Sequence, residues 1–191
     1  LTTAFSNGYP MTIPSAMINR IASLNYVILN RTQWQSNFDV NKAKTAKCGL
    51  AIESSINGTD ATIIVHNGFN QTLTGNYTAS VYLVEDQVSG TGNMYDQRNG
   101  YNGTAGHPYY GQGDPIIGFK HNYTLRKVLS APLGDAISSS AIVAGGKESK
   151  TYTTTLTGYT SANLYVVAFI TKTGTTATGY EIMNVQRVKL G

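Results

Sequence analysis

Residues 45–66 read TAKCGLAIESSINGTDATIIVH, and their spacing gives the first indication of the fold. Before the turn, one set of small or apolar residues alternates with a second set that contains Lys47 and Glu53. A period of two is typical of a strand with one buried face. Asn57-Gly58 is a favourable type I′ hairpin turn, and residues 61–66 supply an apolar returning strand. The segment therefore predicts an antiparallel hairpin. The first set comprises Ala46, Cys48, Leu50 and Ile52.

Further strand-like segments follow along the chain. They cover residues 77–85, 151–157, 164–171 and 180–190, and Gly158, Gly174 and Gly179 mark turns between the last three. Because little helical periodicity separates them, we predict a mainly β fold, an antiparallel β-sandwich of immunoglobulin-like or jelly-roll-like type, over residues 45–191. The side chains predicted to face inward are Cys48, Leu50, Ile52, Ile63, Val65, Val81, Leu83, Val167 and Phe169.

Residues 1–44 have a different pattern. Residues 15–20 and 26–29 read as two short extended segments that could pair as a hairpin. Thr32 and Gln35 then resemble a capping box that opens a short helix through about Lys42, with Trp34 and Phe38 on one face. The predicted order of this first unit is strand, strand, helix.

Composition excludes several classes of protein. Only 13% of residues are charged, against about a quarter in ordinary domains, and Thr, Asn, Gly and Tyr are abundant, which suits an exported β protein. The formal charge of +4 is scattered along the chain, so we expect no nucleic-acid partner. The longest apolar run, residues 164–170, is too short to cross a bilayer. The chain begins at Leu1 without a leader, which we interpret as a fragment of a longer protein.

No pattern of reactive side chains specifies a reaction. Cys48 is the single cysteine, so we expect no internal disulfide and interpret it as a small buried residue. There is no G-x-S-x-G elbow, and His66, His107 and His121 lack metal-ligand spacing. A calcium loop near Asp96 and Asn99 lacks its acidic ligands, and turn formation explains it better. We therefore predict no catalysis, no cofactor and no metal.

One long segment interrupts the strands. Residues 87–119 are rich in glycine and follow neither a helical nor a strand period. An insertion of this size is usually functional or disordered. Its tyrosines give it the composition of a binding loop or a sugar-stacking site, although the same rings could instead pack a flap along the sandwich. The candidate ligand residues are Tyr95, Tyr101, Tyr109 and Tyr110.

Two segments that flank this insertion resemble a known family. The chain reads VYLVED at residues 81–86 and HNYTLR at residues 121–126, and ends on a strand that contains IMNVQ at residues 182–186. These motifs, in this order, resemble the outer-membrane lipoproteins of about 28 kDa in Bacteroidetes, over roughly residues 14–190. The resemblance implies a β domain preceded by the end of a thioredoxin-like module, here residues 1–44, with Ile13-Pro14 as a cis-proline loop. The half that would carry a redox-active cysteine pair is absent from this sequence.

The resemblance also implies a function and a location. We expect a non-catalytic binding or structural domain of a lipoprotein at the bacterial outer membrane, on its periplasmic or cell-surface face, anchored only through a lipid outside this chain. Its partner would be an unknown protein or glycan, and a homodimer is possible. One alternative is the substrate-docking part of a thioredoxin-like oxidoreductase whose cysteines lie elsewhere. A second is a carbohydrate-binding module.

The flanking motifs also give a hypothesis for the base of the insertion. Glu85 and Asp86 precede it, and His121, Asn122 and Arg126 follow it, so the two groups should meet where it leaves the sheet. A partly buried carboxylate needs donors such as Arg or His to offset its desolvation. We expect either a structural clamp or a polar ligand site there, and favour the clamp.

Overall fold

The computed structural model describes residues 14–23, 26–176 and 179–191. The described residues form two large antiparallel sheets, one small two-stranded sheet and few helices, which confirms the mainly β prediction. The larger sheet has the order β10-β9-β5-β6, with β7 also paired to β5, and the smaller sheet has the order β3-β4-β8. The strands of the two sheets are β3 (Cys48–Asn57), β4 (Asp60–Phe69), β5 (Asn76–Glu85), β6 (Thr124–Val128), β7 (Asp135–Ala136), β8 (Lys147–Thr155), β9 (Leu164–Thr173) and β10 (Ile182–Lys189).

Residues of the two sheets pack together in two apolar clusters. Ile63 and Val65 of β4 pack with Val81 and Leu83 of β5, and all four are buried as predicted. Leu50 and Ile52 of β3 pack against the same core while half-buried. The period of two therefore identified the inner faces of β3, β4 and β5.

The prediction for β9 was wrong by one residue. Val81 pairs with Ala168, so the core side of β9 carries Val166 and Ala168 instead of Val167 and Phe169. Phe169 is buried on the opposite face, where its ring packs edge-on against Tyr82 at 5.0 Å. A continuous apolar run such as residues 164–170 does not reveal which alternate set faces the core.

The first unit has the predicted order of elements. Its strands β1 (Ser15–Ala16) and β2 (Leu29–Asn30) pair antiparallel, and a 3-10 turn η1 (Arg31–Gln33) leads into helix α2 (Trp34–Lys42). The Ile182 amide donates to the Asn19 carbonyl at 2.8 Å, which joins this unit to β10. The expected cis bond at Ile13-Pro14 lies outside the described residues. In the described part of the chain, no helix is long and apolar enough to cross a membrane.

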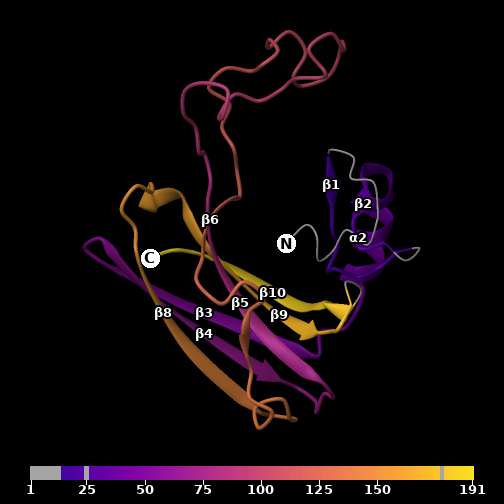
Figure 1. Ribbon diagram of the computed structural model, residues 1–191, viewed down its shortest axis with the longest axis vertical. Helices are drawn as coiled ribbons and strands as arrows, with labels where there is room; N and C mark the ends of the chain where they lie inside the picture. The colour runs from indigo at the N-terminus through magenta and orange to yellow at the C-terminus, as the bar shows by residue number, and fades with distance from the viewer. Residues whose placement is uncertain (1–13, 24–25, 177–178) are drawn as a thin grey trace.

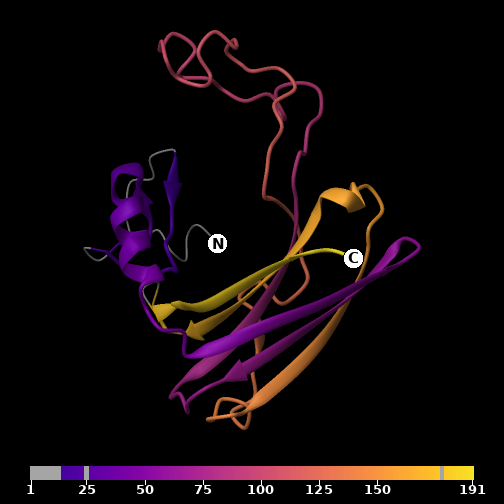
Figure 2. The ribbon, with the colours of Figure 1, turned by 180° about the vertical axis from the view of Figure 1, so that it is seen from behind.

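The segment between β5 and β6 leaves the sheets altogether. Residues 86–123, which we call the arm, extend away from the two layers and bend at the far end toward the side of β1, β2 and α2 (Figure 1, Figure 2). The predicted alternative, a flap packed along the sheets by its tyrosines, is therefore not what the structure shows.

Candidate functional site

The base of the arm is held by buried and half-buried polar contacts. Glu85 is 5% exposed, and its carboxylate accepts a hydrogen bond from the Thr160 amide at 2.8 Å and forms an ion pair with Arg126 Nε at 3.3 Å. Asp86 accepts from the Tyr123 amide at 2.7 Å. The expected contact of Glu85 with Arg126 is thus present, while Asp86 uses a backbone donor that the sequence did not suggest.

The other two residues expected at the base bind elsewhere. Asn122 Oδ1 accepts from the amide and the side chain of Gln87, at 3.1 and 2.8 Å. His121 Nε2 lies 2.7 Å from the Tyr95 carbonyl, farther along the arm. The five predicted residues therefore make separate contacts, and only Glu85 and Arg126 form a predicted pair.

Two residues at the base adopt strained backbone conformations. Gln87 has a φ of 60° and Tyr123 a φ of 55°, which are left-handed values that cost a non-glycine residue about 1–3 kcal/mol each. The bonds from Asp86 to Tyr123 and from Asn122 to Gln87 act on these same residues. Because such strain persists only where neighbouring contacts fix it, the base of the arm is a defined bend.

Above this bend the arm is a narrow two-stranded stalk. Val88 and His121 exchange two backbone hydrogen bonds of 2.9 Å each, and Gln97 and Ile116 form a second bridge with bonds of 3.2 and 2.8 Å. The side chain of His121, a member of the first bridge, also reaches the Tyr95 carbonyl near the second. The stalk is therefore held by two backbone bridges and one side-chain contact.

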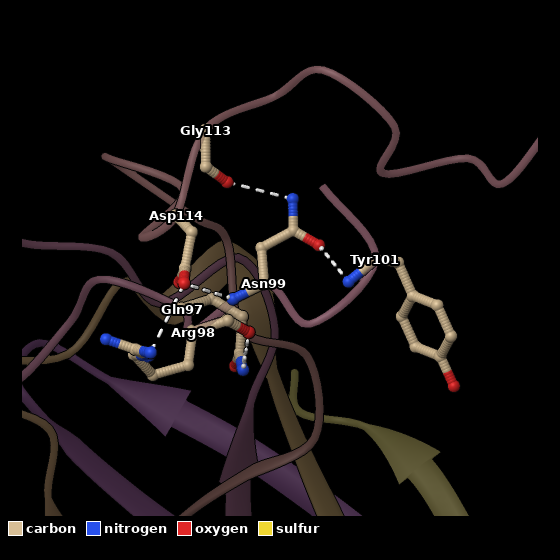
Figure 3. A network of polar contacts seen from close by, with 6 residues as sticks. All are labelled: Gln97, Arg98, Asn99, Tyr101, Gly113 and Asp114. Carbon is tan, nitrogen blue, oxygen red and sulfur yellow. Dashed lines mark hydrogen bonds and ion pairs between the residues drawn. The ribbon is translucent and has the colours of Figure 1, made fainter. Parts of the chain in front are cut away.

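The far end of the arm, residues 97–114, is organised by Asn99. This side chain is 4% exposed, and its amide nitrogen donates to the carbonyls of Tyr109 and Gly113, at 2.8 and 2.9 Å. Its oxygen accepts from the Tyr101 amide at 3.1 Å, and its own backbone amide donates to Asp114 at 2.9 Å (Figure 3). A buried amide with its hydrogen bonds satisfied specifies one loop conformation.

Aromatic rings line the arm from its tip to the stalk. Tyr101 stacks on His107 with a ring separation of 3.9 Å and an interplanar angle of 11°, and His107 lies 5.5 Å from Tyr109. Phe119 continues the row at 6.0 Å from Tyr109 and 4.9 Å from His121. These five rings form what we call the aromatic ladder. Tyr101 and Tyr109 pack within the arm, yet both remain partly exposed.

The tip also contacts the first unit. Arg31 Nη1 donates a hydrogen bond to the Tyr101 hydroxyl, across 70 positions of sequence. In Figure 3 the Tyr101 ring points away from the Asn99 network that holds its backbone. Nothing in the sequence pattern pairs these two residues, so the contact was missed.

Three further residues near the base were also not predicted from the sequence, namely Arg187, Tyr165 and Tyr159. Arg187 of β10 lies between the rings of Tyr123 and Tyr165, at 5.1 and 4.8 Å, and a hydrogen bond with Tyr123 raises the pKa of Arg187. Arg126 covers the Tyr159 ring at 5.0 Å. A polar cavity of about 260 Å³ adjoins them and is lined in part by Glu85, Tyr95 and Arg126.

The reactive side chains lie in separate environments. Burial raises the pKa of the Cys48 thiol to about 11, so this cysteine remains a protonated thiol at neutral pH. His66 contacts Ser149 at 2.7 Å and Glu53 at 3.0 Å, across three neighbouring strands. Glu53 is mostly in solvent, so it lacks the buried setting that orients a catalytic imidazole. Among the described residues, no group of three potential ligands could hold a metal.

Comparisons with known proteins place the chain in a family. A search of curated proteins found no match. Among solved structures, HBP35 of Porphyromonas gingivalis matches with a TM-score of 0.58 and 18% identity, over 84% of this chain and 45% of that chain. The chain thus spans less than half the length of that protein, and the likeness shows the fold alone. A family model for outer membrane protein Omp28 matches residues 3–191. This match covers nearly the whole sequence, so the chain belongs to the Omp28 outer membrane protein family.

Proposed function

We propose that this chain is a binding domain of an outer-membrane lipoprotein and that the arm is the element that contacts the ligand. One observation carries the proposal. The arm uses its buried polar side chains, above all Asn99, to hold its own shape, while its four tyrosines keep between 36% and 55% of their surface exposed. A segment that served only packing would bury those rings against the sheets.

The chemistry of the exposed side chains supports a binding role. Tyr110 is 55% exposed at the far end of the arm, and Met94 and Ile117 expose most of their surface along it. Tyrosine presents a large, stiff surface with a polar end, and a backbone fixed in advance lowers the entropy lost on binding. Such a surface suits a glycan ring or a protein partner. Glu85 and Arg126 then act as the structural clamp beneath it.

The rest of the molecule supports the arm. We propose that the two sheets form a β-sandwich, since Val81 of one sheet and Ile63 of the other share a core. We also propose that residues 1–44 correspond to the end of a thioredoxin-like module, because the described part has the order strand, strand, helix. A cysteine pair encoded upstream of Leu1 would favour the oxidoreductase-docking alternative, and it would leave the arm as the docking element.

A glycan array tests the binding role directly. The intact chain, a variant with residues 89–120 replaced by a short Gly-Ser linker, and the substitution Tyr110→Ala are applied to surface glycans of Gram-negative bacteria. Tyr26→Ala is the matched control, because Tyr26 is a partly exposed tyrosine outside the arm. We expect binding by the intact chain and the control, and about a tenfold loss for Tyr110→Ala, since an aromatic contact contributes about 0.5–1.5 kcal/mol beyond its buried area. Equal binding with and without the arm would refute its role.

A further inference from the structure

The long strand β8 has an unprotected edge. It is the outer strand of the order β3-β4-β8 and lies at the margin of its sheet (Figure 1). Its nine residues pair with β4 in one unbroken register, without a bulge and without proline. An exposed edge of this length is a template for another strand, and proteins usually block such edges.

The other margins of the two sheets are interrupted, short or in contact with another strand. β10 has a bulge between Ile182 and Asn184, and β6 has only five residues opposite a register shift in β5. At the margin of β3, Asn184 Nδ2 of β10 donates to the Cys48 carbonyl at 2.7 Å, and β10 lies against β3. Among the described residues, β8 combines an unbroken nine-residue register with no strand on its outer side.

The hydrogen bonds at the two ends of β8 show which of its backbone N–H and C=O groups are free. The Phe69 amide donates to the Gly146 carbonyl at 3.0 Å, and the Leu156 amide donates to the Thr59 carbonyl at 2.8 Å. In an antiparallel ladder every second residue repeats this pairing, so the even-numbered residues of β8 face β4. The odd-numbered residues direct their N–H and C=O groups outward, and all are exposed. They are Lys147, Ser149, Thr151, Thr153 and Thr155.

We infer that β8 pairs with β8 of a second copy of this chain, antiparallel and with a two-fold axis at Thr151. This register brings all nine residues into overlap. Because the axis passes through an odd-numbered residue, the free N–H and C=O groups of each copy meet those of the other. Ser149 lies opposite Thr153 of the second copy, and hydroxyl side chains are favourable partners across strands. The result is a continuous six-stranded sheet.

Charge complementarity favours a second copy over an unrelated strand. In this register Lys147 lies opposite Thr155 of the second copy, and Thr155 Oγ1 donates to Asp60 at 2.9 Å on the next strand. Lys147 and Asp60 make no ion pair within the described residues, and both are exposed. The pairing therefore brings two unpaired lysines beside two unpaired aspartates and sets no like charges opposite each other.

Sedimentation analysis of the chain between about 1 µM and 1 mM, the range of weak association, gives the first test. We expect a reversible dimer. Thr151→Pro removes a free N–H, a change that an edge strand tolerates, and should leave the protein folded and monomeric. Thr151→Val keeps the N–H and is the matched control. A monomer at every concentration overturns the inference.

Cross-linking tests the register itself. Residues that face each other at a hydrogen-bonded site have Cα atoms about 5.5 Å apart, which suits a disulfide. Thr151→Cys should therefore give a covalent dimer under mild oxidation. Thr153→Cys is the control, because its counterpart lies four residues away along the strand, about 13 Å. Equal cross-linking by the two variants, or none in either, contradicts the two-fold axis at Thr151.

Charge reversal tests the contribution of the ion pairs. Lys147→Glu should weaken the dimer by about threefold to tenfold, as expected for exposed pairs. Combining it with Asp60→Lys should restore the association. If the double variant dimerises no better than Lys147→Glu alone, the second copy does not bind in this register.

Discussion

The side chains that hold the two sheets are apolar and follow a period of two, whereas those that hold the arm are polar and follow no period. Ile63 and Leu83 exclude water between layers, and their contribution grows with buried area. Asn99 and Glu85 instead satisfy particular donors and acceptors, so their contribution depends on geometry. The two regions should therefore lose structure under different perturbations, and the arm should open without unfolding the sheets.

The largest effect is expected in the sheet core. Leu83→Ala leaves a cavity between the layers and should lower the free energy of unfolding by about 2–5 kcal/mol. Chemical denaturation measures the loss, and Leu125→Ala, on the exposed side of β6, is the control. Protease cleavage within residues 100–113 under native conditions should not change. Faster cleavage there would mean that the arm and the core unfold together.

A smaller effect is expected at the tip of the arm. Asn99→Ala leaves the carbonyls of Tyr109 and Gly113 without their donor, at a cost of about 1–3 kcal/mol confined to residues 97–114. Hydrogen exchange should show faster exchange in that segment and unchanged protection in β4 and β9. Asn37→Ala, on helix α2, is the control. Unchanged exchange in the arm would show that its tyrosines hold it.

At the base of the arm the expected effect is smaller again. Asp86→Ala removes the acceptor of the Tyr123 amide. The lost hydrogen bond contributes about 0.5–1.5 kcal/mol, and its loss should release the bend at the base. Limited proteolysis should then cut residues 100–113 faster, before any change in the melting of the sheets. Asp39→Ala, which removes an exposed acid from α2, should have no such effect. If both variants are cut at the same rate, Asp86 does not fix the bend.

The smallest effect concerns Asp135 of β7, which joins the two sheets through polar contacts with Lys150 and Tyr152 of β8. Burial disfavours the charged form of Asp135, but hydrogen bonds from Lys150 and Tyr152 outweigh it, so the pKa of Asp135 is lowered. The stabilisation is present above the unfolded pKa of about 4 and is lost as the pH falls through the lower folded value. The free energy of unfolding of the wild type should exceed that of Asp135→Asn by up to about 1 kcal/mol at pH 7. This difference should shrink below about pH 4. A constant difference from pH 7 to pH 2 would contradict this linkage.

The same contrast explains what could be predicted from the sequence. The buried faces of β3, β4 and β5 could be predicted, because apolar and more polar residues alternate along a strand with one buried face. The face of β9 could not be predicted, since both of its sides are apolar. Glu85 and Arg126 were found because they flank the insertion. The Thr160 amide and Arg31 lie 75 and 70 positions from their partners, and no local pattern records such contacts.

The unequal lengths of β5 and β6 determine how the arm would transmit a mechanical force. A ligand pulling on the tip loads both strands at once, through Glu85 and Thr124. β6 is short and pairs with β5 alone, so few hydrogen bonds resist its displacement. β5 lies inside its sheet and pairs with β9 along all of Asn76–Glu85, so tension along it loads those hydrogen bonds in shear. Under tension β6 is therefore the strand that yields first, and β5 is the anchor that keeps the arm attached.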